Sequence, residues 1–137
     1  MAFFKIPDID HGWIIADPNQ NCHVSCQKHN LQCTDDELRA HNEDVNTSDK
    51  VIKLIKSLGQ QITMTECKIG FGIKAVPLFS TRTNNGYKQQ FCYAASTYKK
   101  TFSCSSVPAP AKENRQRLCW CHEYKGKLLP LWASPDY

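Results

Sequence analysis

The sequence lacks the features that direct a chain toward membranes, polyanions or calcium. No apolar stretch approaches the length of about 20 residues that a membrane-spanning helix needs. The net charge is only +4, and the basic residues form no continuous run of the kind that binds nucleic acid. No Asp-x-Asp-x-Asp-Gly loop is present, so the acidic residues at 35–37 and 43–44 fit helix-terminal charges at least as well as calcium ligands. We therefore expect neither membrane insertion nor nucleic-acid binding.

A secretory signal is also missing, although cysteine is abundant. Residues 1–8 carry no apolar run of the signal-peptide kind. The 137 residues nevertheless contain eight cysteines, an even number that favours an oxidising compartment. Either a signal has been removed, or oxidation occurs elsewhere, as in virus assembly within a host cytoplasm. We expect the extracellular space or the secretory lumen, with a virus particle as the alternative.

The spacing of four cysteines suggests how the chain is held together. Cys22 and Cys26 are about one helical turn apart and would share one face of a helix. Cys119 and Cys121 are one strand repeat apart and would share one face of a strand. This matched spacing suggests two parallel disulfides between an N-terminal helix and a C-terminal strand. With the other four, Cys33, Cys67, Cys92 and Cys104, the sequence alone leaves the connectivity open.

Three helices are expected in the first half of the chain. The first runs from about residue 21 to about 30, where Asn tolerates the left-handed conformation common at helix ends. The second begins at 34–37, where Thr-Asp-Asp-Glu has the form of a capping box, and continues to about 41. The third has a Thr-Ser-Asp start at 47–49, apolar residues at helical spacing and a glycine stop at 59, with Lys50, Lys53 and Lys56 on its wet face.

Short apolar runs predict strands, most of them after residue 59. A turn is expected at 84–86 and an extended connection at 107–111. The pattern predicts an α+β fold, with N-terminal helices packed on a small, mostly antiparallel sheet. We divide the chain into an arm (1–11), one module (12–122) and a tail (123–137) whose apolar stretch 128–132 would cap the core or bind a partner. The expected strands are 11–16, 62–67, 76–79, 91–93, 101–104 and 118–122.

The cysteine pattern resembles a known family. Its elements are Cys22-x3-Cys26-x6-Cys33, then Cys67, Cys92, Phe102-Ser-Cys104 and Arg117-Leu-Cys119-Trp-Cys121. Together with His41-Asn42 and the Val-Pro-x-Pro at 107–110, they resemble the cysteine-rich C-terminal module of N-acetylglucosaminyltransferase V, a Golgi glycosyltransferase. Cysteine-rich modules of algal and protist proteins are similar. The resemblance covers about Gly12 to His122.

The resemblance implies a bonding pattern and a fold, but no active site. In the family the module lies outside the catalytic machinery, and this chain has no room for the nucleotide-sugar domains. We therefore do not expect a glycosyltransferase. The implied disulfides are Cys22 with Cys119, Cys26 with Cys121, Cys33 with Cys104, and Cys67 with Cys92.

Two kinds of chemistry compete with disulfides for the cysteines. A zinc-organised interaction domain would use Cys22, Cys26, Cys33, Cys119, Cys121 and His122, but Cys-x-Cys fits a zinc knuckle poorly. A catalytic cysteine would need a neighbour such as His23, His29 or His122. An even, fully pairable set argues against both, so we expect no enzyme, no cofactor and no metal site. The histidines His11, His23, His29 and His41 are interpreted as surface residues.

Carbohydrate binding is the more serious alternative function. Exposed Trp and Tyr rings stack on sugars, although three Trp in a chain of this size more often fill the core. Trp120 lies between two cysteines and so points to the other side of its strand, toward either a second core layer or a binding face. Asn46-Thr47-Ser48 is a glycosylation sequon. The candidate ligand face consists of Trp13, Trp120, Tyr87 and Tyr93, with Tyr98 and Trp132 as further candidates.

Taken together, these patterns favour a non-catalytic structural or interaction module. It would belong to an extracellular coat or a virus particle shell and would contact protein neighbours. The alternative is a carbohydrate-binding module, followed by the zinc-organised domain.

Overall fold

The described part of the chain folds into three short helices, a five-stranded sheet and a two-stranded ribbon, which confirms the predicted α+β class. The computed structural model describes residues 11–70, 72–81, 83–84, 87–88, 90–97, 101–109 and 111–123. The helices in these ranges are α1 (Cys22–Gln27), α2 (Asp35–Ala40) and α3 (Ser48–Ser57), with 3-10 turns η1 (Asn42–Asp44) and η2 (Ala111–Glu113). The strands in sheet order are β1 (His11–Ile15), β7 (Gln116–His122), β3 (Leu78–Ser80), β6 (Phe91–Ala94) and β2 (Lys68–Ile69).

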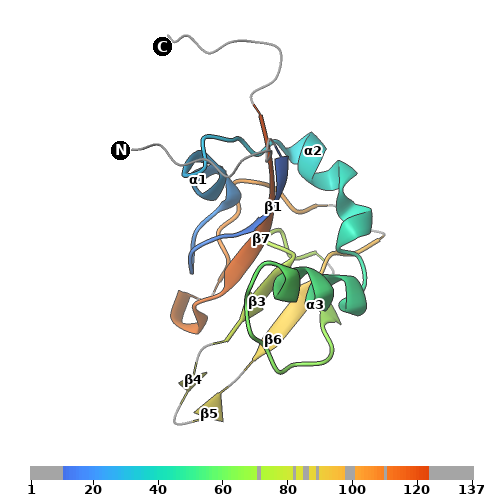
Figure 1. Ribbon diagram of the computed structural model, residues 1–137, viewed down its shortest axis with the longest axis vertical. Coiled ribbons are helices and arrows are strands. Elements are labelled where there is room, and N and C mark those ends of the chain that lie inside the picture. The colour runs from blue at the N-terminus through green and yellow to red at the C-terminus, as the bar shows by residue number, and fades with distance from the viewer. Residues whose placement is uncertain are drawn as a thin grey trace.

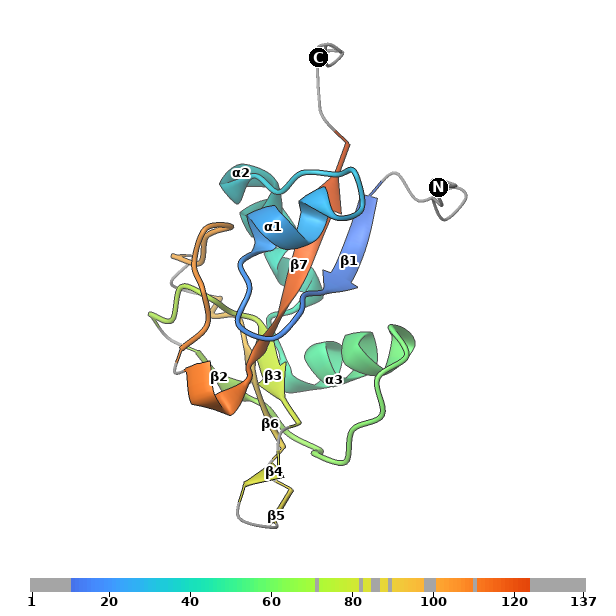
Figure 2. The same ribbon diagram turned by 90° about the vertical axis from the view of Figure 1, so that its left-hand side faces the viewer.

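Strand β7 is the strand that connects the parts of the fold (Figure 1). It pairs antiparallel with β1 along five residues and antiparallel with β3 at its beginning, and among the described strands only β2 and β6 pair in parallel. Both views place α1, α2 and β1 at one end of the molecule and a separate ribbon, β4 (Thr83–Asn84) with β5 (Tyr87–Lys88), at the other (Figure 2). Helix α3 contacts β6. The longest strand therefore links the helical end to the rest of the sheet.

Local sequence signals explain the first and third helices. The Asn21 side chain accepts a hydrogen bond from the amide of Val24 at 2.8 Å, and Asn30 follows α1 with a φ of 61°. The Thr47 hydroxyl accepts from the amide of Lys50 at 3.2 Å, and Gly59 follows α3 with a φ of 92°. These caps and stops are confirmed. The three lysines of α3 are exposed, as expected.

The predicted capping box of α2 is wrong in one detail. Thr34 is the N-cap residue, but its side chain makes no capping hydrogen bond among the described residues. Its hydroxyl lies 3.0 Å from Nε2 of His122 instead. The start of α2 is therefore joined to the end of β7 rather than satisfied within its own helix.

Two predicted strands are wrong because their backbone amides donate hydrogen bonds to side chains instead of to a neighbouring strand. In the segment 62–67, the amide of Thr63 donates to the Gln90 side chain and that of Cys67 donates to the Ser48 hydroxyl at 2.7 Å. In the segment 101–104, the amide of Cys104 donates to a carboxylate oxygen of Asp35 at 2.9 Å. Strand pairing requires these groups to face a neighbouring strand, so both segments remain irregular.

The other predicted strands are found with shifted bounds. The run 76–79 becomes β3, 91–93 becomes β6, and 118–122 starts two residues earlier as β7. The run 11–16 gives β1, which is half-buried at the sheet edge rather than fully buried. Pairing of Asn84 with Tyr87 agrees with a hairpin at 84–86, although 85 and 86 lie outside the described residues. Residues 1–10 of the predicted arm (1–11) and 124–137 of the predicted tail (123–137) also lie outside them.

The core lies between the helices and the sheet. Leu38, Val45 and Ile55 from the helical half are fully buried, as are Phe79 and Leu118 from the strands. Half-cystines fill much of the remaining space, since seven of the eight are less than 4% exposed. The disulfides therefore act both as cross-links and as core side chains.

Candidate functional site

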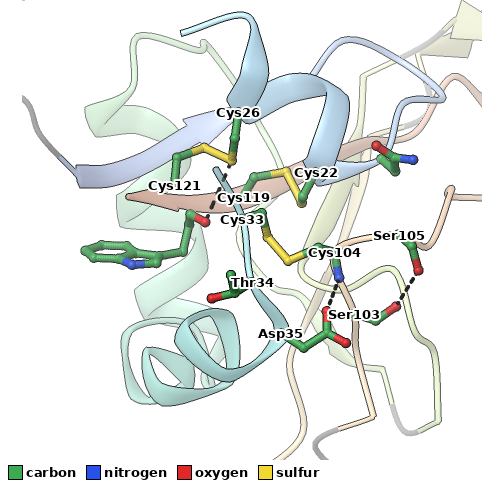
Figure 3. Close-up of a disulfide and its surroundings, with 12 residues drawn as sticks. Cys22, Cys26, Cys33, Thr34, Asp35, Ser103, Cys104, Ser105, Cys119 and Cys121 are labelled. Atoms are coloured by element: carbon green, nitrogen blue, oxygen red, sulfur yellow. Dashed lines mark hydrogen bonds between the residues drawn. A yellow bond between two sulfur atoms is a disulfide. The ribbon is translucent and has the colours of Figure 1, made fainter. Parts of the chain in front are cut away.

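Two disulfides join α1 to β7 in parallel; we call them the rungs. Cys22 is bonded to Cys119 and Cys26 to Cys121, each with a Cα–Cα distance of 5.4 Å (Figure 3). They connect one face of the helix to one face of the strand, as the spacing suggests. The other disulfides are Cys33–Cys104 and Cys67–Cys92, and the four pairs are those that the family resemblance implies.

Because all eight cysteines are paired in disulfides, no free thiol remains in this structure for zinc binding or for a cysteine nucleophile. No cysteine is free. The zinc alternative and the catalytic-cysteine alternative both need thiolates, and in this structure each sulfur is bonded to another sulfur. Within the described ranges, no group of three or more His, Cys, Asp or Glu side chains is placed to hold a metal ion.

Cys67–Cys92 is the most accessible of the four disulfides. Cys67 is half-buried, whereas the other seven half-cystines are buried. Because thiol–disulfide exchange requires direct attack on a sulfur atom, we predict that a limiting dose of reductant under native conditions opens this bond first. Trapping with a thiol-specific alkylator and peptide mapping would then show label on Cys67 and Cys92. Equal labelling of Cys22 or Cys119 at early times would contradict this order.

On the opposite side of β7, an aromatic cluster joins three parts of the chain. The ring of His41 stacks on that of Trp120, with centroids 3.5 Å apart and planes at 19°. Trp13 from β1 meets Trp120 edge-on at 5.6 Å. Asp44 Oδ2 accepts a hydrogen bond from Trp13 Nε1 at 3.1 Å and lies 3.2 Å from His41 Nδ1. The cluster thus ties β1 and β7 to the α2–η1 segment.

The cluster corrects two sequence-based expectations. Trp120 does point away from the disulfides, but it is only 8% exposed because His41 and Trp13 cover it. The prediction that Trp120 belongs to an exposed ligand face is therefore wrong, and Trp120 belongs to a core layer. His41 is half-buried and stacked rather than a plain surface residue. Trp13 is half-buried, and beside it Asp44 leaves 49% of its side chain exposed.

The remaining aromatic candidates do not join this cluster. Tyr93 lies on β6, two strands away from β7, where it contacts Phe91 with ring centroids 6.0 Å apart. The Arg115 guanidinium covers both rings, at 5.1 Å from the Phe91 centroid and 5.6 Å from that of Tyr93. The side chain of Tyr87 lies outside the described residues, as do Tyr98 and Trp132. The four-residue ligand face therefore does not form one continuous platform.

The sequon residue Asn46 is partly buried and takes part in a hydrogen bond with α3. Asn46 is half-buried, and its Oδ1 accepts a hydrogen bond from Lys50 Nζ at 3.3 Å. The hydroxyl of Ser48, the third sequon residue, accepts from the amide of Cys67. His23 and His29 are exposed, as expected, while the side chain of His11 lies outside the described residues.

Sequence reasoning missed the buried cation of the sheet, Arg117. It is 0% exposed, and its Nη1 donates to the carbonyls of Ser103 at 2.6 Å and Ser106 at 2.9 Å. Its Nη2 donates to the carbonyl of Val76 at 3.4 Å. Burial lowers the pKa of Arg117 to about 10, opposed by the negative charge of Asp35, so the group stays protonated at neutral pH. A usable signal existed, since 117, 119 and 121 share the inward, cysteine-bearing face of β7.

Comparison with known proteins adds no family assignment. The sequence matches no protein-family model, and no match was found among curated proteins. Among the residues that the structure describes, none forms a helix long and apolar enough to span a membrane.

Proposed function

We propose that this protein is a non-catalytic structural and interaction module of an extracellular coat or a virus particle shell. The observation that carries the proposal is the set of four disulfides, two of which hold the first helix to the central strand. Four disulfides in a small domain are typical of extracellular or secreted proteins. Such a scaffold resists unfolding and can display its surface rigidly to neighbouring proteins.

The family resemblance belongs to the same proposal. A shared bonding pattern with the C-terminal module of N-acetylglucosaminyltransferase V would place this chain among non-catalytic modules. The four disulfide pairs support that relation because 105 pairings of eight cysteines exist.

A second candidate function, glycan recognition, is supported by one local arrangement. Trp13 is half-buried beside the partly exposed carboxylate of Asp44, which is 3.1 Å from the indole nitrogen. An aromatic ring next to a carboxylate can stack on a sugar and accept hydrogen bonds from its hydroxyls. This arrangement is smaller than the four-residue face expected from the sequence.

Intact mass and sedimentation of the oxidised protein test the first proposal. We expect a mass eight hydrogen atoms below that of the reduced chain, no alkylation in denaturant without reductant, and concentration-dependent assembly up to about 1 mM. A monomer at every concentration would count against the structural role. Retention on immobilised glycans that is lost in Trp13→Ala, by a protein that stays monomeric, would favour the second candidate instead.

A further inference from the structure

A cavity of about 320 Å³ lies beside the start of β7; we call it the Lys74 cavity. Its walls come from the segment leading into β3, from the loop 106–109 and from Arg115. Its volume is at the lower end of the range of small-molecule sites, about 300 to 1,000 Å³. The apolar wall residues that keep exposed surface are Ile73, Val107 and Ala109. The cavity is thus suited to a compact apolar group.

The polar part of the lining carries positive charge. Lys74 is exposed, and Ser106 adds a hydroxyl group. Arg115 is held by Glu113, whose Oε1 accepts from its Nε at 2.8 Å and lies 2.7 Å from its Nη2. Among the described residues, these contacts occupy one edge of a guanidinium that has five N–H donors, and the Nη1 edge keeps donors for another acceptor. The rings of Phe91 and Tyr93 fix the guanidinium plane, so its orientation is set before any ligand arrives.

A third cation, Arg117, is hydrogen-bonded to the backbone of the cavity wall. Arg117 donates to the carbonyl of the cavity residue Ser106 and to that of Val76, which lies between two lining positions of the chain. All its hydrogen bonds go to backbone carbonyls, and its Nε has no partner within the described part of the chain. Among the described residues, the charge of these three cations is offset by Glu113, which bonds to Arg115, and by the negative charge of Asp35, which acts on Arg117, so one positive charge remains in excess. A cavity with this excess attracts an anion.

We propose that the Lys74 cavity binds a small organic carboxylate, with the carboxyl group between Lys74 and Arg115 and its apolar body against Ile73, Val107 and Ala109. A charge-assisted hydrogen bond from each cation and burial of a short hydrocarbon group supply the affinity. Such a ligand is either a free carboxylate or the C-terminal residue of another protein. The inference rests on the cavity alone and is independent of the role proposed above.

Titration of the ¹⁵N-labelled, fully oxidised protein with 4-methylpentanoate tests the site by NMR. We expect saturable shifts of the amides of Lys74, Ser106 and Val107 with a Kd of about 1 mM. The matched probe, 4-methylpentanamide, keeps the shape without the charge and should bind about tenfold more weakly. N-acetyl-leucine distinguishes the sources, because tighter binding than 4-methylpentanoate indicates a protein C-terminus and weaker or equal binding indicates a free carboxylate.

Two variants separate the cavity from general electrostatic attraction. Lys74→Gln, at an exposed position, should leave the spectrum elsewhere unchanged and weaken binding about tenfold. Lys53→Gln removes the same charge from the solvent-exposed face of α3 and should change the Kd by less than about twofold. The proposal is overturned if no saturable shift occurs by about 20 mM, if the amide probe binds equally well, or if both variants behave alike.

Discussion

Removing both rungs is expected to lower the free energy of unfolding by about 5 to 6 kcal/mol, more than twice the loss from removing either one. The substitutions are Cys22→Ala with Cys119→Ala, Cys26→Ala with Cys121→Ala, and the fourfold combination. Chemical denaturation under non-reducing conditions measures each loss. Alanine is chosen because all four positions are 0% exposed and a polar replacement would add its own burial cost.

The excess over additivity follows from the loops that each bond closes. The rungs span 97 and 95 residues of sequence, but Cys33–Cys104 already joins the intervening chain. When one rung is present, the other closes a loop of only about six residues, worth about 2 kcal/mol. When neither is present, the first closes a loop of about 25 residues through Cys33–Cys104, worth about 3.5 kcal/mol. Either rung alone therefore conceals about 1.5 kcal/mol of the effect of the other.

The disulfide Cys67–Cys92 provides the internal control. It closes a loop of 25 residues that shares no short path with the rungs. Its removal should cost about 3.5 kcal/mol and should add to the removal of a single rung within about 0.5 kcal/mol. Strict additivity of the two rungs, together with additivity of Cys67–Cys92, would show that loop closure does not explain their contribution.

The parts of this structure that were predictable from sequence are those set by local chemistry. Asn21 and Thr47 cap helices because their side chains reach amides three residues on, and Gly59 ends α3 because it accepts a positive φ. The shared face of Cys119 and Cys121 follows from the two-residue repeat of a strand. Each of these inferences needs only neighbours in the sequence.

The parts that failed depend on partners distant in sequence. Thr34 does not cap α2 because His122, 88 residues away, occupies its hydroxyl. The segment 101–104 has the composition of a strand, but the amide of Cys104 donates to Asp35. Trp120 is covered by His41 only because α2 packs on that side of β7. No local pattern specifies these contacts, so the candidate ligand face and two of the strands could not be placed correctly.

Replacement of Arg117 tests which of two opposing effects dominates in the core. Burial of the guanidinium, opposed by the charge of Asp35, lowers its pKa to about 10, which corresponds to a net destabilisation of the charged form by about 3 kcal/mol in the folded state. Against this, its loss removes a donor from the carbonyls of Ser103, Ser106 and Val76, at about 1 to 3 kcal/mol each. Among the described residues, the Ser103 carbonyl alone of the three keeps a second donor, the amide of Ser106 at 3.4 Å. We expect Arg117→Met to destabilise the protein by about 2 to 4 kcal/mol, because losing the hydrogen bonds to three carbonyls outweighs removing one buried charge.

Arg117→Lys is the matched control, since it keeps the charge but loses the planar fork that reaches several carbonyls at once. We expect about half the loss of the Met variant, because an ammonium group supplies three donors from a single point. Below about pH 10 both the folded and the unfolded wild-type chains carry the Arg117 proton, so neither loss should vary between about pH 6 and 9. Above about pH 10 the folded wild-type chain releases this proton before the unfolded chain does, so this group makes wild-type stability rise with pH. A Met variant as stable as the wild type would mean that water satisfies the three carbonyls and that the buried charge, rather than its hydrogen bonds, governs this position.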